Sequence, residues 1–297
     1  MSAPRPLGRH DLTRVASRLG VPTEVIEKDY ILSYLLAGIA AVPGLSGLCF
    51  KGGTALKKMY FGDYRFSEDL DFSAVGVPSG VELDGLIGES RQAVLDRLAT
   101  RGRFQIVIDR PPERGPYPTG QDVFRALVAF PWQRTPLVRL KIEVTHDEPV
   151  LLTAAERTMQ HGYEEIGESI DDVHLATYAL EEIVAEKLRA ILQSRQRMHV
   201  RGWSRPRSRD YYDLWRILTE RATEVHPALI RHILPEKLAN RGVVYSTVDD
   251  FFSPPLQVEV RRHWQSNLGI FVPALPTADE VLATLPSLVG GLLEAVT

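Results

Sequence analysis

The chain has 297 residues, of which 44% are hydrophobic and 25% charged, and this ordinary globular composition excludes a disordered or fibrous protein. Its 35 Lys and Arg against 38 Asp and Glu give a net charge of −3, which excludes a uniformly basic nucleic-acid coat but not a local basic patch. The single cysteine, Cys49, excludes an internal disulfide framework and any zinc site built on cysteines. No apolar run reaches the length of a membrane helix and the N-terminus lacks a secretion signal, so we expect a cytoplasmic protein without a membrane partner.

Residues 1–150 combine helical and strand patterns. Hydrophobic spacing and composition predict helices over 8–19 and 22–40, a short apolar segment at 48–50, a helical segment at 55–60, a strand over 66–73, a helix over 82–100 and strands over 103–109, 122–130 and 137–145. We therefore expect a first domain with N-terminal helices and a mixed β-sheet at its centre.

Residues 151–297 read as mainly helical. The predicted helices cover 180–193, 209–218, 227–240, 255–267 and 278–295, and the polar, basic stretch 195–208 is predicted to be a loop. At this length two subdomains are expected. The fold class is therefore α+β, with a sheet domain over 1–150 and a helical domain over 151–297 that completes the active site.

Two motifs in the first half indicate phosphate chemistry. Gly52 and Gly53 stand between an apolar segment and a helix, where backbone N–H groups can approach phosphate oxygens closely. In the strand 66–73, alternation places Asp69 and Asp71 on one face, together with Ser67. Two carboxylates on one strand face repel each other, and a bound cation offsets that repulsion. Mg²⁺ between carboxylates and a triphosphate is typical of nucleotidyl transfer. Either motif alone is more typical of a turn or a solvated strand edge.

A third acid is a candidate member of this site. Glu143 shares one face of the strand 137–145 with Arg139 and Lys141. If this strand pairs with 66–73, Glu143 can reach the two aspartates, as a metal ligand or as a base for the acceptor hydroxyl. The alternative is a surface charge on a half-exposed strand.

A second group of charged residues lies in the helical half. Lys187 falls on a predicted helix and can contact nucleotide phosphates as a compact positive charge. Asp210 and Asp213 are three residues apart and share a helix face, so either one is a candidate for a late catalytic acid. The alternative for each segment is an ordinary charged helix face.

The stretch from Lys187 to Arg216 is strongly basic. It holds nine Lys and Arg against two acids, a local charge of +7, and Trp203 lies within it. Basic residues interleaved with aromatics suit phosphate contact and base stacking on RNA, and the alternative is a solvated loop. The candidate RNA-binding residues are Arg195, Arg197, Arg201, Arg205, Arg207 and Arg209.

Three segments of the sequence carry a resemblance to a known family. They are Glu27-Lys28-Asp29-Tyr30, then Phe50–Leu56 with Arg65–Phe72, and then Ala185-Glu186-Lys187-Leu188 with Arg209–Leu214. In these segments the chain resembles the AbiEii family of nucleotidyltransferase-like toxins, which includes the MenT toxins. The middle segment is the most specific, and the last third of the chain matches only in being helical.

The resemblance implies a polymerase-β-like nucleotidyltransferase fold and a bacterial type IV toxin with an AbiEi-like antitoxin encoded nearby. It implies Mg²⁺ as cofactor, a nucleoside triphosphate (NTP) as substrate, and the 3′ end of tRNA as acceptor, with translation blocked. Carried over to this sequence, it implies that Asp69 and Asp71 are metal ligands and that Lys187 and Asp210 join them as catalytic residues. The nucleotide would lie against Lys51, Gly52, Gly53, Thr54 and Arg65.

Three hypotheses of function remain. The first is a Mg²⁺-dependent nucleotidyltransferase that moves a nucleoside monophosphate (NMP) from an NTP to RNA. The second keeps the enzyme but transfers to a protein or small-molecule hydroxyl. The third is a catalytically idle binding module that retains the nucleotide fold, and the intact Asp69 and Asp71 pair argues against it.

Overall fold

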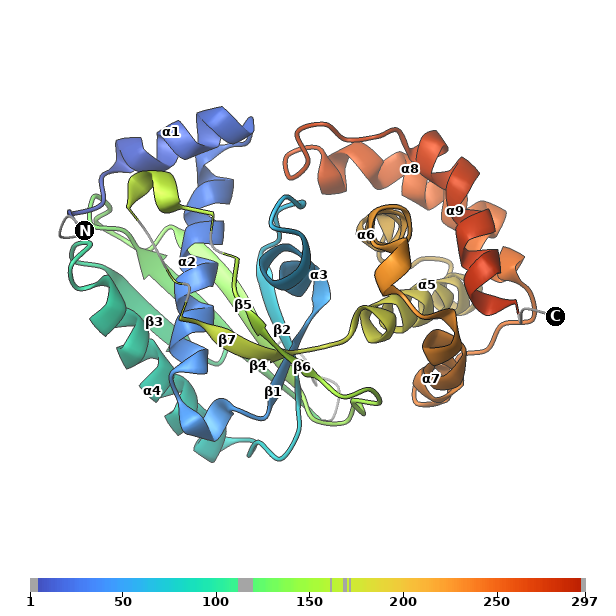
Figure 1. The fold of residues 1–297 in the computed structure, drawn as a ribbon, viewed down its shortest axis with the longest axis horizontal. Helices are drawn as coiled ribbons and strands as arrows, with labels where there is room; N and C mark the ends of the chain where they lie inside the picture. The colour runs from blue at the N-terminus through green and yellow to red at the C-terminus, as the bar shows by residue number, and fades with distance from the viewer. Residues whose placement is uncertain (1–4, 112–119, 161, 168–169, 171, 295–297) are drawn as a thin grey trace. The chain divides into compact units, whose positions relative to one another are not determined.

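The computed structural model describes residues 5–111, 120–160, 162–167, 170 and 172–294, and these form two compact units (Figure 1). The first unit comprises residues 1–150 and 154–177, and the second comprises residues 151–153 and 178–297. Residues 154–177, placed with the helical half in the sequence analysis, therefore group with the sheet. This is because two short strands within them pair with the sheet.

The first unit is built on a mixed seven-stranded sheet in the order β3-β4-β5-β2-β1-β7-β6. Its strands are β1 Leu48–Lys51, β2 Asp69–Ala74, β3 Gln105–Asp109, β4 Gln121–Ala129, β5 Val138–Thr145, β6 Ala155–Thr158 and β7 His174–Thr177. The pairs β2–β5 and β1–β7 are parallel, and the other neighbouring pairs are antiparallel. The expected mixed sheet is confirmed.

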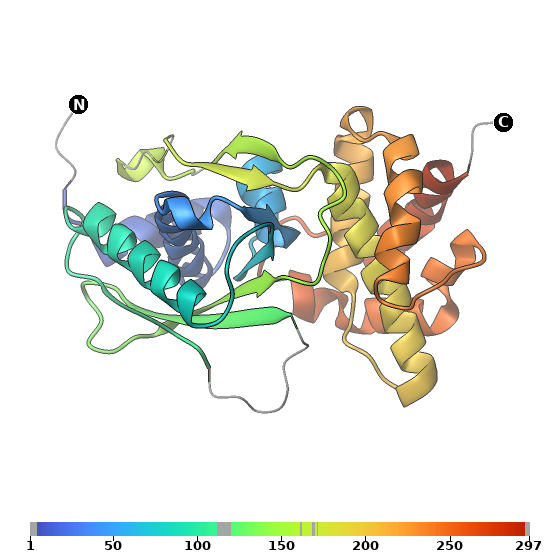
Figure 2. The ribbon, with the colours of Figure 1, turned by 90° about the horizontal axis from the view of Figure 1, so that it is seen from below.

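Helices pack beside this sheet. They are α1 Arg9–Leu19, α2 Thr23–Ala40, the short α3 Gly52–Ala55 that continues into a π-helix over Leu56–Phe61, and α4 Val81–Leu98, with 3-10 turns at Pro43–Leu45 and Glu164–Ile166. Helix α2 contacts α1, α4 and β5, and Figure 2 shows α2 and α4 side by side. Because it is covered on several sides, nearly every residue of α2 is buried, in keeping with its apolar sequence.

The second unit is helical, as expected. It contains α5 Leu180–Arg201, α6 Ser208–Glu220, α7 Pro227–Ala239, α8 Pro254–Leu268 and α9 Ala278–Leu293, with 3-10 turns at Ala222–Glu224 and Val248–Phe252. Its own core includes the fully buried Ile191, Leu214 and Val281. No helix among the described residues is long and apolar enough to cross a membrane.

Two local expectations are wrong. The basic residues 195–201 are the last two turns of α5 rather than a loop, because Arg and Gln are good helix formers and the helix continues until Gly202, which adopts φ +75°. Strand β2 begins at Asp69, so Ser67 lies in the irregular segment before it and does not share the strand face with the aspartates.

Candidate active site

Strands β2 and β5 bring three acids together in the first unit. Their parallel register places Asp71 opposite Glu143 and Asp69 opposite Lys141. The strand pairing on which the candidacy of Glu143 depends is therefore present. Since side chains alternate along a strand, Asp69, Asp71, Lys141 and Glu143 all lie on one face of the sheet.

The electrostatics of Asp71 reflect this crowding. Burial raises the pKa of the Asp71 carboxyl to about 6, and the nearby carboxylates of Glu143 and Asp69 act in the same direction. The ammonium groups of Lys141 and Lys51 partly oppose the rise. Two carboxylates and two ammonium groups therefore surround Asp71, and burial is the main reason that its carboxylate is disfavoured in the absence of a bound cation.

Gly52 allows the loop after β1 to lie directly against Asp71. Its φ is +80°, a conformation that side-chain-bearing residues rarely adopt. A Cβ at this position would lie 2.6 Å from Asp71 Oδ2. The first glycine of the motif is thus required both by backbone conformation and by the carboxylate beside it.

The residues after Gly52 connect the glycine loop to the other site residues. A Cβ on Gly53 would collide with the guanidinium of Arg65, which is itself buried. Thr54 Oγ1 donates a hydrogen bond of 2.5 Å to the backbone oxygen of Asp69. The structure therefore places Arg65, the glycine loop and the start of β2 in one compact arrangement.

Lys51 has a partner that the sequence analysis missed. Its ammonium forms an ion pair with Glu148, and both side chains are largely buried. In the β1–β2 register Lys51 also lies opposite Asp71. Glu148 is 97 residues from Lys51 and follows β5 in an irregular segment, so no local pattern indicated the contact.

Of the three acids on this face, Asp69 and Asp71 suit a hard divalent cation. Among the described residues, no group of three or more His, Cys, Asp or Glu is arranged to hold a metal ion. Lys141 Nζ donates to Glu143 Oε2 at 2.6 Å, so a lysine holds the third acid of the face. Mg²⁺ is commonly held by one or two carboxylates plus substrate phosphates and water, and Asp69 and Asp71 fit that donor set.

The second unit contains the Lys187 cluster. Lys187 Nζ, on α5, lies 2.5 Å from Asp213 Oδ2 and 3.2 Å from Asp210 Oδ1, both on α6. Asp213 is fully buried, whereas 19% of the Asp210 side chain is exposed. Asp213 thus has the position of a structural counter-charge, and Asp210 remains accessible to a ligand.

The candidate RNA-binding arginines fall into two sets. Arg195 pairs with Asp250 at 2.8 Å, and Arg209 donates to the Asn267 carbonyl while its guanidinium lies 4.8 Å from the ring centre of Phe271. These two are engaged within the unit. The second set surrounds Arg197, whose pKa is lowered by burial and then by four neighbouring arginines, namely Arg189, Arg201, Arg205 and Arg207.

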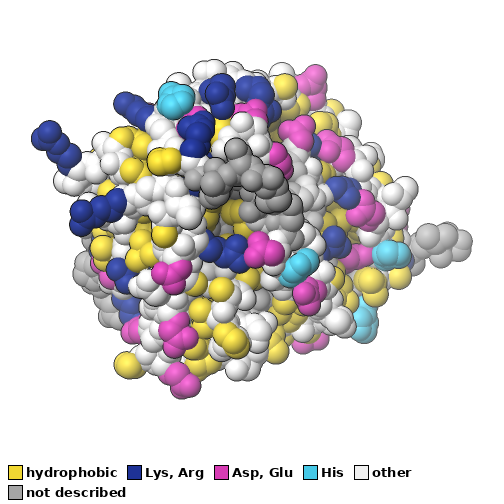
Figure 3. Space-filling model, turned by 60° about the vertical axis from the view of Figure 1, so that its left-hand side comes forward, with side chains coloured by type: hydrophobic (Ala, Val, Ile, Leu, Met, Phe, Trp, Pro, Cys, Tyr) yellow, Lys and Arg dark blue, Asp and Glu magenta, His cyan; other side chains and the backbone are white. Residues whose placement is uncertain are grey.

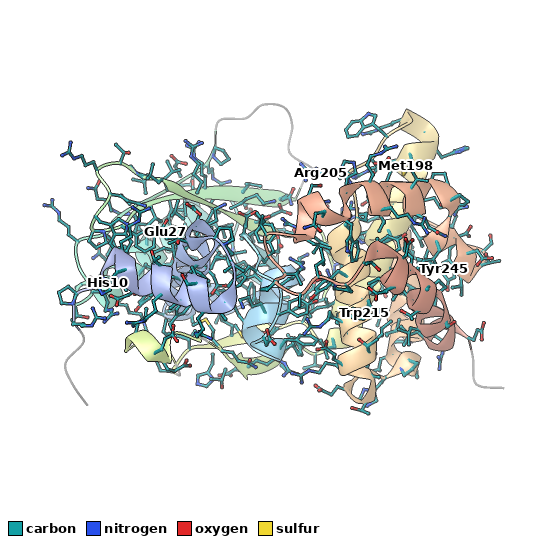
Figure 4. All side chains as sticks on the ribbon, turned by 90° about the horizontal axis from the view of Figure 1, so that it is seen from above. His10, Glu27, Met198, Arg205, Trp215 and Tyr245 are labelled. Carbon is teal, nitrogen blue, oxygen red and sulfur yellow. The ribbon has the colours of Figure 1, made fainter. Side chains whose placement is uncertain are left out.

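The arginine cluster is connected to the Lys187 cluster. Ser194 Oγ, on α5, donates to Ser204 Oγ at 2.8 Å and so fixes the 203–207 loop beside the helix. Figure 4 labels Arg205 on this loop and Met198 on α5. At the far end of the loop, Arg207 lies 3.5 Å from Asp210. Positive charges therefore extend along the loop as far as the partly exposed Asp210.

Comparison with known proteins identifies the family of the chain. The family model described as "Nucleotidyl transferase AbiEii toxin, Type IV TA system" matches residues 34–284, which is most of the chain. The chain belongs to the AbiEii family of nucleotidyltransferase toxins. It is therefore a nucleotidyltransferase of a type IV toxin–antitoxin system, a class that implies an NTP substrate and an antitoxin partner.

A solved structure supports the fold of this AbiEii protein. MenT4, a nucleotidyltransferase toxin from Mycobacterium tuberculosis, is similar with a TM-score of 0.68 and 20% sequence identity. The similarity covers 97% of this chain and 90% of that one. Among curated protein sequences, none matches the chain.

Proposed function

We propose that this AbiEii toxin transfers NMP from an NTP to an RNA acceptor, at the 3′ end of tRNA, in a Mg²⁺-dependent reaction that blocks translation in the cytoplasm. The observation that carries the proposal is the glycine loop lying against Asp71 on a sheet face that also presents Asp69 and Glu143. This combines a loop able to approach phosphates with carboxylates that favour a cation.

The chain's own residues have separable roles in this proposal. Asp69 and Asp71 would hold Mg²⁺, which supplies charge neutralisation on the triphosphate when bound. Backbone groups at Gly52 and Gly53, with Lys51, Thr54 and Arg65 around them, position the NTP. Their contribution is orientation and electrostatic stabilisation.

Lys187 and Asp210 are the remaining residues to which this proposal gives a role. Lys187 neutralises charge that develops on the phosphates. Asp210 is the late acid, because Asp213 is buried as the counter-charge of Lys187. The acceptor 3′ hydroxyl attacks the α-phosphorus in line, the bond to the β-phosphate oxygen breaks, and pyrophosphate leaves. Glu143 takes the hydroxyl proton or contributes to metal binding.

RNA as the acceptor is supported by the arginines around Arg197. The charge of Arg197 is disfavoured by burial and by four neighbouring guanidinium groups, an effect that phosphate anions would offset, and Trp203 on the same loop is 66% exposed. An exposed indole offers a stacking surface for an unpaired base. The cluster leads through Arg207 to Asp210, so an RNA bound there approaches the proposed catalytic residues of the second unit.

The direct test is incubation of the protein with total bacterial tRNA, Mg²⁺ and each α-labelled NTP in turn. We expect label on tRNA from a preferred NTP, and at least a 1,000-fold loss in Asp69→Ala, consistent with removal of a metal-binding carboxylate. Circular dichroism checks that this variant remains folded. Transfer retained by Asp69→Ala would contradict the site, and label on protein or on a small molecule instead of tRNA would contradict the acceptor.

A further inference from the structure

Lys141 is the cation on the acidic face for which the proposed reaction has no role. It lies directly opposite Asp69 in the β2–β5 register, and its ammonium donates to Glu143 Oε2 at 2.6 Å. Glu143 in turn lies opposite Asp71. The lysine therefore lies beside the same carboxylates that a metal ion would use.

Burial lowers the pKa of the Lys141 ammonium, but the acids Glu143, Asp71 and Asp69 outweigh burial and raise that pKa. On the next strand Arg125 is opposite Lys141, but Arg125 pairs with Asp109 on β3 at 3.0 Å. Arg139, two residues before Lys141 on the same face, is exposed and lies opposite Leu127. Glu143, the acid that Lys141 contacts at 2.6 Å, lies on the same sheet face as Asp69 and Asp71.

The Lys141–Glu143 contact is one that a metal ion can replace. The Lys141 and Glu143 side chains are 41% and 25% exposed, and partly solvated pairs of this kind contribute little to stability. A lysine ammonium is a single positive charge on a flexible stem, whereas a divalent ion carries twice the charge at shorter range. A metal ion can therefore replace the lysine without disturbing the sheet.

We propose that Lys141 is an internal counter-ion that holds Glu143 while the site is free of metal and competes with the divalent cation for the acidic face. Glu143 becomes available to the metal site only when Lys141 is displaced. Lys141 is then a positioning residue that sets the metal affinity of the protein and limits metal capture in the absence of nucleotide. This inference rests on the metal-dependent reaction proposed above.

The test is the affinity of the full-length protein for Mn²⁺ without nucleotide, measured by electron paramagnetic resonance at pH 8 and low salt. Lys141→Met keeps most of the aliphatic stem and removes the charge, and we expect it to bind Mn²⁺ about tenfold more tightly than the wild type. Lys141→Arg retains the positive charge and should remain within about twofold of the wild type.

A matched control separates local competition from general electrostatics. Arg139→Met makes the same charge change on the same strand and face, but Arg139 is two residues further than Lys141 from Glu143. It should leave the Mn²⁺ affinity within about twofold of the wild type, because solvent screens an exposed charge.

The outcomes discriminate between the two proposals. Tighter binding confined to Lys141→Met supports the role of Lys141. Unchanged or weaker Mn²⁺ binding by Lys141→Met, or an equal gain in Arg139→Met, overturns it while leaving the nucleotidyl transfer intact. Absence of Mn²⁺ binding in all variants, and in the wild type with NTP added, overturns both.

Discussion

Asp71 carries a charge that the fold opposes, and this has a measurable consequence. Its pKa is raised from the ordinary 3.8 to about 6, by burial and then by Glu143. Between these two values the folded chain holds a proton that the unfolded chain has released. Stability from this group is therefore present at low pH and is lost as the pH rises to about 6 and beyond.

The corresponding variant is Asp71→Asn, measured without metal. We expect it to be more stable than the wild type at pH 8 by about 2 kcal/mol, and the difference to shrink as the pH falls toward 4. Urea unfolding at pH 5 and pH 8 gives both values. The same pH dependence in the two proteins would show that Asp71 titrates normally.

At the scale of elements, the contact between α5 and α6 assigns different roles to two acids one turn apart. Asp213 is fully buried beside Lys187, whereas Asp210 is partly exposed. Removing one partner of a buried ion pair leaves an uncompensated charge and costs about 3 kcal/mol or more. Removing a partly exposed partner costs far less.

We therefore expect Asp213→Ala to lower the free energy of unfolding by about 3 kcal/mol and Asp210→Ala by less than about 1 kcal/mol. Asp210→Ala should nevertheless lose transfer activity. Thermal unfolding and the labelled-NTP assay on the same preparations separate the two effects. Full activity in a stable Asp210→Ala protein would remove Asp210 from the proposed site.

Elements with strong periodicity could be predicted from the sequence. The alternation around Asp69 and Glu143 predicted two strands, each with its acids on one face, and the β2–β5 pairing places these acids on the same face of the sheet. Strands β6 and β7 were missed because each has only four residues, too few to establish a period. The end of α5 was missed because a basic, polar sequence is typical of both loops and solvated helix turns.

Contacts between distant segments of the chain could not be predicted in this way. The Lys51–Glu148 pair joins residues 97 positions apart. The choice between Asp210 and Asp213 as the late catalytic acid was left open, because both share a helix face. Burial, which hydrophobic patterning alone does not resolve for charged residues, distinguishes them.

At the scale of the whole molecule, charge is distributed unevenly along a chain of net charge −3. The face shown in Figure 3 mixes acidic and basic side chains, as expected for a protein without a uniformly basic coat. The basic stretch 187–216 carries +7, so RNA affinity should depend on a few residues there.

Arg197→Glu/Arg201→Glu tests this dependence. We expect at least a tenfold loss of tRNA affinity at 150 mM salt and a salt-dependence slope reduced by about 1 to 2, because each phosphate contact contributes roughly 0.7 to 0.9. Arg261→Glu/Arg262→Glu, on α8, makes the same change in net charge outside the cluster and should have little effect. Equal losses in both variants would indicate non-specific attraction.

Nucleotidyl transfer to RNA joins the α-phosphate of an NTP to the acceptor. The most direct measurement compares the preferred NTP labelled at the α-phosphate with the same NTP labelled at the γ-phosphate, using tRNA as acceptor. We predict label on tRNA from the α-position alone, with one pyrophosphate released per nucleotide added. Label on tRNA from the γ-position, or none from either, would contradict nucleotidyl transfer to RNA.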